Sequence, residues 1–210
     1  IADNGYLSYN AQGILTDAIT DNATLGGNDT VTLGIGTNVV LGGNGSDVIT
    51  TAGGDDQIIG DNGQFTYDAQ GVITQAKTTD LSQGAADVIS AGDGVNLVLG
   101  GQGGDTITTG NGNDVVIGDN GQIDLVNGIR REVFSTDTTN GTGGNDVISV
   151  GAGDDQVIAG VGNDSVTNAA GETIIIGDDG QISSDASGRY TLAKTGDITI
   201  GGNDSIVGGS

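Results

Sequence analysis

Oxygen-bearing side chains recur at one place in a glycine-rich turn, and their type and spacing suit them to chemistry. One copy reads Gly42-Gly43-Asn44-Gly45-Ser46-Asp47 and is followed by Val48-Ile49-Thr50. The sixth position of the turn recurs every nine residues within each block, at Asp29, Asn38, Asp47, Asp56, Asp87, Asn96, Asp105, Asp114, Asp146, Asp155, Asp164, Thr173 and Asp204. The chain therefore offers side-chain oxygens at a regular spacing.

These turns suit a hard divalent cation. Calcium takes about six to eight oxygen ligands at roughly 2.3–2.6 Å. Glycines let the backbone adopt positive φ and direct carbonyl oxygens inward, and an aspartate such as Asp47 adds charge. A single turn cannot complete such a shell, but two turns stacked roughly 4.8 Å apart can close one between them. We therefore expect calcium ions between stacked turns.

The residues after each turn predict how the turns are positioned. A Val or Ile lies two residues after every sixth position, as in Ile49 after Asp47. A three-residue strand would turn this side chain inward and its neighbours outward. Such short units bury an apolar side chain only by stacking on their neighbours, which is a solenoid. Because this core is thin, we expect metal binding and folding to be one transition.

A longer period overlies the nonapeptides. The module start Asp3-Asn4-Gly5 recurs at Asp61, Asp119 and Asp178, which are 58, 58 and 59 residues apart. Each module has an insert, over roughly 3–24, 61–81, 119–140 and 178–199, followed by four nonapeptides. This predicts modules at 1–60, 61–118 and 119–177 and a partial module at 178–210.

The inserts are predicted to be β-hairpins. In the second, the stretch 64–67 alternates polar and apolar residues, and Asp68-Ala69-Gln70-Gly71 fits a type I turn closed by a glycine with positive φ. The third has the two-residue turn signal Asn127-Gly128. All aromatic and basic residues lie in inserts, so the aromatics either pack the hairpins onto the solenoid or contact partners. We expect exposed hairpins to form lateral knobs that cover the roll or join neighbouring stalks. They would lie on one side if each module has an even number of half-coils and alternate if odd.

The composition limits the classes of partner that this chain is expected to bind. The net charge is -23, which disfavours nucleic acid and anionic membrane surfaces and favours cations. There is no Cys for disulfides or thiolate metal sites, and no stretch approaches the roughly 18 apolar residues of a membrane span. Without metal, an acidic glycine-rich chain of this kind is expected to be disordered. The sequence begins at Ile1 without a signal-peptide pattern, and we interpret it as a window of a longer repetitive protein.

The blocks Gly26–Ile59, Gly84–Ile117, Gly143–Ile176 and Gly201–Gly209 closely resemble RTX calcium-binding repeats. The resemblance implies an all-β fold, a right-handed parallel β-roll with two nonapeptides per coil, here interrupted by a β-hairpin insert every 58–59 residues. It also implies calcium between turns on the same side. On that geometry Asp29 pairs with Asp47, Asn38 with Asp56, Asp87 with Asp105 and Asp146 with Asp164, and Asp105 pairs onward with the Asp119 turn.

The resemblance assigns the metal ligands residue by residue. Asn38 and Asn96 keep an oxygen without the charge, which predicts weaker sites, and Thr173 predicts no normal site. Asp61, Asp119 and Asp178 either cap the ion columns or form plain Asx-type turns. The expected ligands are Asp29, Asp47, Asp56, Asp87, Asp105, Asp114, Asp146, Asp155, Asp164, Asp204, Asn38, Asn96, Asp61, Asp119 and Asp178.

The favoured function is a calcium-stabilised stalk or fibre segment of a large secreted bacterial RTX protein, acting in surface adhesion, biofilm or extracellular fibre formation. The alternative is a calcium-triggered secretion and folding module of an RTX toxin or secreted hydrolase. The chain has no His, which excludes Ser-His-Asp triads and His-based zinc protease motifs, so no enzyme is expected. The turns show no regular Thr array for ice binding. The resemblance implies an extracellular or cell-surface location, and fibres could form through the hairpins.

Overall fold

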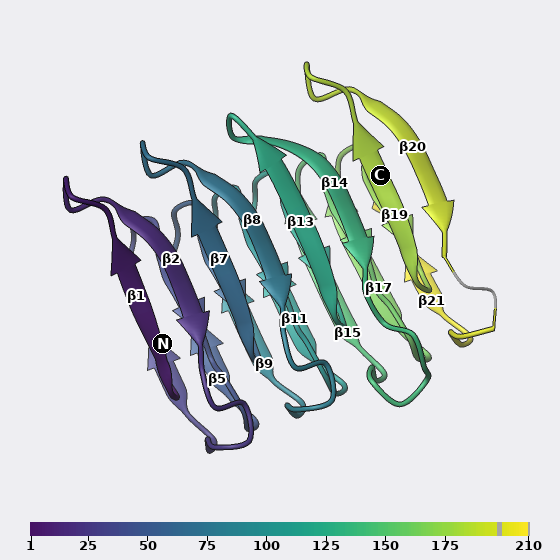
Figure 1. The fold of residues 1–210 in the computed structure, drawn as a ribbon. Helices are drawn as coiled ribbons and strands as arrows, with labels where there is room; N and C mark the ends of the chain where they lie inside the picture. Colours follow the sequence, from purple (N-terminus) through teal and green to yellow (C-terminus); the bar gives the residue numbers. More distant parts are fainter. Residues whose placement is uncertain (197–198, 210) are drawn as a thin grey trace.

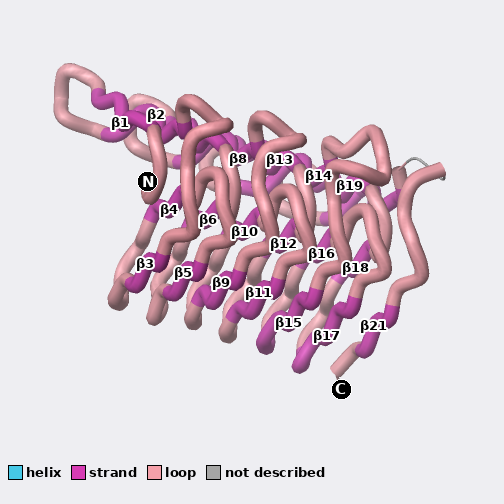
Figure 2. The backbone as a smooth tube through the Cα atoms, turned by 90° about the horizontal axis from the view of Figure 1, so that it is seen from below, coloured by secondary structure: helices cyan, strands magenta, loops and turns pink. Residues whose placement is uncertain are grey.

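Three β-sheets are stacked as layers along the described part of the chain. The computed structural model describes residues 1–196 and 199–209, and no helix occurs among them. Figure 1 shows the hairpins side by side in front of the nonapeptide strands, and Figure 2 shows the coils stacked in order from one end to the other. Residues 197–198 of the fourth insert and Ser210 of the last module lie outside the described residues. The described chain is thus an all-β solenoid, as the sequence predicted.

Successive nonapeptides alternate between two parallel sheets. The six-stranded sheet has the order β18-β16-β12-β10-β6-β4 and the seven-stranded sheet the order β21-β17-β15-β11-β9-β5-β3. The six-stranded sheet contains β4 (Val39–Leu41), β6 (Gln57–Ile59), β10 (Leu97–Leu99), β12 (Val115–Ile117), β16 (Gln156–Ile158) and β18 (Ile174–Ile176). The seven-stranded sheet contains β3 (Thr30–Thr32), β5 (Val48–Thr50), β9 (Val88–Ala91), β11 (Thr106–Thr109), β15 (Val147–Ala152), β17 (Ser165–Ala170) and β21 (Ser205–Val207). Two nonapeptides therefore make one coil.

The repeated Val and Ile positions stack in register between these two sheets. Ile58 of β6 pairs with Val40 of β4 and Val98 of β10, and Ile49 of β5 pairs with Ile89 of β9. Side chains at this position interdigitate between the sheets as one core. The neighbouring Val48 points outward and is 41% exposed, as expected where successive side chains alternate between faces.

The inserts are antiparallel hairpins. They consist of β1 (Gly5–Tyr9) with β2 (Leu15–Thr20), β7 (Gly63–Tyr67) with β8 (Ile73–Thr78), β13 (Gly121–Val126) with β14 (Ile129–Ser135), and β19 (Gly180–Ser184) with β20 (Tyr190–Thr195). Gly71 closes the second turn at φ 82° and donates its N–H to the Asp68 carbonyl. The third turn has positive φ at both Asn127 and Gly128, which suits a tight two-residue turn. The predicted hairpins and turn residues are confirmed.

The hairpins cover the roll, which is one of the two roles expected for them, but they do not stand apart as separate knobs. They join into one eight-stranded sheet, β1-β2-β7-β8-β13-β14-β19-β20. Each module supplies two coils, so every hairpin leaves from the same edge, and a two-stranded hairpin is about as wide as two coils at the usual strand spacing. Neighbouring hairpins therefore meet: β2 pairs with β7, and the Gly63 N–H donates to the Thr20 hydroxyl at 2.9 Å.

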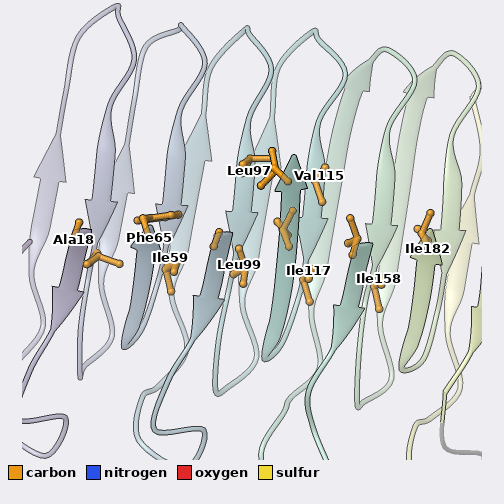
Figure 3. Packing of buried hydrophobic residues seen from close by; sticks show 14 of the residues in the cluster. Ala18, Ile59, Phe65, Leu97, Leu99, Val115, Ile117, Ile158 and Ile182 are labelled. Carbon is orange, nitrogen blue, oxygen red and sulfur yellow. The ribbon is translucent and has the colours of Figure 1, made fainter. Parts of the chain in front are cut away.

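A second core lies between this hairpin sheet and the six-stranded sheet (Figure 3). Ala18, Phe65 and Ile182 project from the hairpins onto Ile59 and Ile158 of the parallel strands, and all five are buried. The Tyr67 hydroxyl donates to Gln57 Oε1 at 2.6 Å. Phe65 and Tyr67 therefore pack the second hairpin onto the roll, whereas Tyr6 and Tyr9 at the first hairpin are exposed. Among the described residues, no helix has the length and apolar character needed to cross a membrane.

Candidate metal centre

The glycine-rich turns form two columns along opposite edges of the roll. We call the column from which the hairpins leave the insert edge, and the other the plain edge. The sixth positions at the insert edge are Asp29, Asp47, Asp87, Asp105, Asp146, Asp164 and Asp204, and those at the plain edge are Asn38, Asp56, Asn96, Asp114, Asp155 and Thr173. Every insert-edge position is therefore acidic, whereas the plain edge has three carboxylates in six positions.

A ladder of hydrogen bonds links successive turns in each column. The backbone N–H of Asp29 donates to Asp47 Oδ1 at 2.8 Å, and that of Asp47 donates to Asp87 Oδ1 at 2.7 Å. The same contact joins Asp87 to Asp105, Asp146 to Asp164, Asp164 to Asp204, Asn38 to Asp56, Asp56 to Asn96, Asn96 to Asp114 and Asp114 to Asp155. The carboxylates are therefore held one above another at the strand spacing.

The partner expected for Asp105 was wrong. The Asp105 N–H donates to Asp146 Oδ1 at 2.7 Å, so Asp146 and not the Asp119 turn continues the column. The insert leaves the column at residue 118 and the chain returns with Gly143, because the hairpin is accommodated in its own sheet. Ion columns can thus continue past each insert.

The second carboxylate oxygen is unpaired at most of these aspartates. Within the described part of the chain, Oδ2 is buried and has no hydrogen-bond partner in Asp47, Asp56, Asp87, Asp105, Asp114, Asp146, Asp155 and Asp164. A buried ionised oxygen without a partner is costly, so each needs a proton or a cation. Burial raises the pKa of Asp87 to about 8, and burial together with the neighbouring Asp146 raises that of Asp105 well above its usual range.

Backbone carbonyls share this space with the unpaired oxygens. At Gly100, a Cβ would collide with the carbonyl oxygen of Gly118 and with Asp105 Oδ2. At Gly118, it would collide with the Ala159 carbonyl oxygen and Asp146 Oδ2, and Gly42 and Gly60 repeat the arrangement. No group of three carboxylates among the described residues could hold a metal alone, so turn carbonyls or water would supply the other ligands of any shell. Unpaired carboxylates beside carbonyl oxygens fit calcium, which prefers oxygen ligands.

The aspartates that start the inserts bind backbone N–H groups of the insert-edge turns. Asp61 Oδ1 accepts from Ala85 at 3.2 Å and Oδ2 from Gln102 at 2.5 Å, while Asp119 Oδ1 accepts from Gly144 at 2.9 Å. Burial, with the nearby Asp87, raises the pKa of Asp61 to about 9. These carboxylates reach across coils, which is more than an Asx-type turn within one segment.

Asp178 accepts from Gly202 at 2.8 Å in the same manner. The sequence reasoning missed Asp3, whose Oδ2 accepts the Asn44 N–H at 2.7 Å. The module start Asp3-Asn4-Gly5 was the signal that could have found it.

The plain edge is less acidic. Thr173 has no carboxylate, and the neighbouring Glu172 is exposed. From the third hairpin, Arg130 Nη1 donates to the Asn113 carbonyl at 2.9 Å, close to Asp114. Burial raises the pKa of Asp114 and lowers that of Arg130. The need for cations to balance buried carboxylates is therefore greatest at the insert edge.

Comparison with known families agrees with this geometry. A model of the RTX calcium-binding nonapeptide repeat matches the chain in four copies, at residues 34–64, 84–107, 90–122 and 135–166. No curated protein matches the chain. The structure continues the same pattern beyond those copies, because Val166 of β17 pairs in register with Ile206 of β21.

Proposed function

Since this chain carries RTX calcium-binding nonapeptide repeats, which bind several calcium ions, we propose that it is a stalk segment of a large secreted bacterial RTX protein. Such a stalk would act in surface adhesion, biofilm or extracellular fibre formation. The observation that carries the proposal is that each module joins the next through all three sheets. The unit is a hairpin with four nonapeptides, at 1–60, 61–118, 119–177 and, in part, 178–210.

Growth by modules suits a rigid spacer. Each module adds two coils, and hence about 10 Å of length at the usual strand spacing. We propose a right-handed coil with its hairpins every 58–59 residues along one face. Phe65 and Ile182 sit in the core shared by the hairpins and the roll, so the inserts brace the stalk along its length.

Calcium would make the folding of this stalk depend on whether the chain lies inside or outside the cell. At a net charge of -23, with buried carboxylates one coil apart, the folded chain needs cations. We propose that the chain stays unfolded at low cytosolic calcium and folds outside the cell, where calcium stabilises the insert edge most. The expected ligands are the insert-edge aspartates together with Asp56, Asp114 and Asp155.

The alternative, a secretion and folding module of an RTX toxin or hydrolase, shares the calcium chemistry. The hairpin sheet favours the stalk, because it adds a third layer that calcium-triggered folding alone does not require. Self-association into fibres, if it occurs through the inserts, would use the outer face of the hairpin sheet, since the inner face is buried.

A calcium titration tests the proposal. Far-ultraviolet circular dichroism and small-angle scattering would follow the chain from chelator to millimolar calcium, with magnesium as the control. We expect a cooperative change from coil to β-structure and a rod that lengthens by about 10 Å for each added module. Full β-structure in excess chelator would contradict the calcium requirement, and a length that does not grow with module number would contradict the stalk.

A further inference from the structure

Two amide side chains stand in the plain-edge column where the insert edge has only carboxylates. Asn38 Nδ2 lies 2.8 Å from the Gly36 carbonyl oxygen, 3.2 Å from that of Gly34 and 2.7 Å from Asp56 Oδ1. One nitrogen therefore donates toward two carbonyls of its own turn and the carboxylate of the next coil.

The second amide repeats these contacts one module later. Asn96 Nδ2 lies 3.0 Å from the Gly92 carbonyl oxygen, 3.3 Å from that of Gly94 and 3.0 Å from Asp114 Oδ1. The Asn96 side chain is fully buried, and its Oδ1 accepts the Asp56 N–H at 3.1 Å. A donor on the oxygen side and acceptors on the nitrogen side set the orientation of this amide.

The acceptors around each amide are the oxygen types that a calcium ion needs, turn carbonyls and a carboxylate from the next coil. An amide N–H group carries partial positive charge and satisfies such acceptors by hydrogen bonding. We propose that the amides of Asn38 and Asn96 take the place of the cation in their own turns, so that these two turns close without calcium.

The two edges then differ in their need for calcium. This consequence rests on the proposed calcium-dependent folding. At the plain edge, Asn38, Asp56, Asn96 and Asp114 alternate, so an amide separates the carboxylates of Asp56 and Asp114, whereas Asp155 follows Asp114 directly. This spacing reduces like-charge repulsion without metal. The insert edge has no such amide at its sixth positions, and it therefore controls the calcium response.

The first test counts calcium ions. Isothermal calorimetry and native mass spectrometry would compare the wild type with Asn38→Asp and Asn96→Asp, each of which restores a carboxylate and removes the donor. We expect one additional ion per variant and a higher calcium concentration at the midpoint of folding. Thr37→Asp is the matched control, because it adds the same charge at an exposed neighbouring position, and no additional ion is expected there.

The second test needs no variant in the turns. Nuclear magnetic resonance of the asparagine side chains would follow the Nδ2 protons of Asn38 and Asn96 at saturating calcium, where we expect them to stay protected from exchange. Loss of that protection, or an unchanged ion count in both variants while the wild type binds calcium, would overturn this inference alone. A wild-type chain that binds no calcium would overturn the proposed function as well.

Discussion

Asp47 and Asp87 are forty residues apart, yet the backbone N–H of Asp47 donates to Asp87 Oδ1 at 2.7 Å. The same contact joins Asp29 to Asp47, eighteen residues apart, at 2.8 Å. The hairpin between Asp47 and Asp87 therefore does not interrupt the column. This continuity holds the acidic turns in one uninterrupted column, which is the arrangement that the proposed series of calcium sites requires.

Replacing one buried carboxylate should have opposite effects with and without calcium. Asp105→Asn removes an unpaired oxygen from the insert edge. In calcium we expect the affinity of the local site to fall by roughly tenfold or more, as is typical when a metal site loses a supporting group. In chelator we expect more residual β-structure than in the wild type, because the variant lacks a buried oxygen that otherwise needs a proton or a cation. Calorimetry in calcium and far-ultraviolet circular dichroism in chelator would measure the two effects.

The matched control for that variant is Asp55→Asn, since Asp55 precedes a ligand position but is exposed. It should change neither the ion count nor the residual β-structure in chelator appreciably. Equal behaviour of the two variants would show that general charge, and not the column, matters.

A single methyl group at a turn glycine should disrupt a site. Gly100→Ala places a Cβ against the Gly118 carbonyl and Asp105 Oδ2, and such overpacking costs about 1–3 kcal/mol. Gly27→Ala is the control, because a Cβ there meets no atom within 4 Å. Calcium-dependent unfolding by denaturant would compare them, and a Gly100→Ala protein as stable as Gly27→Ala would contradict the close approach.

Without calcium, stability should fall as pH rises. Burial raises the pKa of Asp87 from 3.8 to about 8 and that of Asp61 to about 9, so the folded state binds more protons than the unfolded state. The protonated carboxyls stabilise the fold below pH 4, and this contribution is lost as pH rises through 8 to 9. Far-ultraviolet circular dichroism of the metal-free chain from pH 4 to 9 would measure how much β-structure remains at each pH.

Saturating calcium should reverse that dependence on pH, because protons then compete with the cation for the same oxygens. A metal-free chain that is more stable at pH 8 than at pH 4 would contradict the burial of these carboxylates.

The hairpins should contribute to global stability. Phe65→Ala leaves a cavity between the hairpin sheet and the six-stranded sheet and should cost about 3–5 kcal/mol. Tyr6→Ala, at a side chain that is 51% exposed, should cost about 0.5 kcal/mol or less. Denaturant unfolding in saturating calcium would compare the two. Equal costs would show that the hairpins fold independently of the roll.

The local features of this protein could be read from its sequence. The nine-residue period predicted the turns and the inward position of residues such as Ile49, because a strand alternates its side chains and a glycine turn needs positive φ. The recurring module start and the Asn127-Gly128 signal predicted the hairpins, and the acidic sixth positions predicted calcium. Each of these depends on a few neighbouring residues.

Only the tertiary structure decided how the modules meet. Whether hairpins stand apart or join depends on the match between hairpin width and coil spacing, and Ala18 pairs with Phe65 across that junction. Because the hairpin width matches the coil spacing, the chain returns after each insert to the insert-edge column of turns. Asp146 and not Asp119 therefore follows Asp105. The contacts of the Asn96 amide likewise depend on residues from separate coils. All of these features depend on contacts between segments that are far apart in the chain. A local sequence pattern does not determine such contacts.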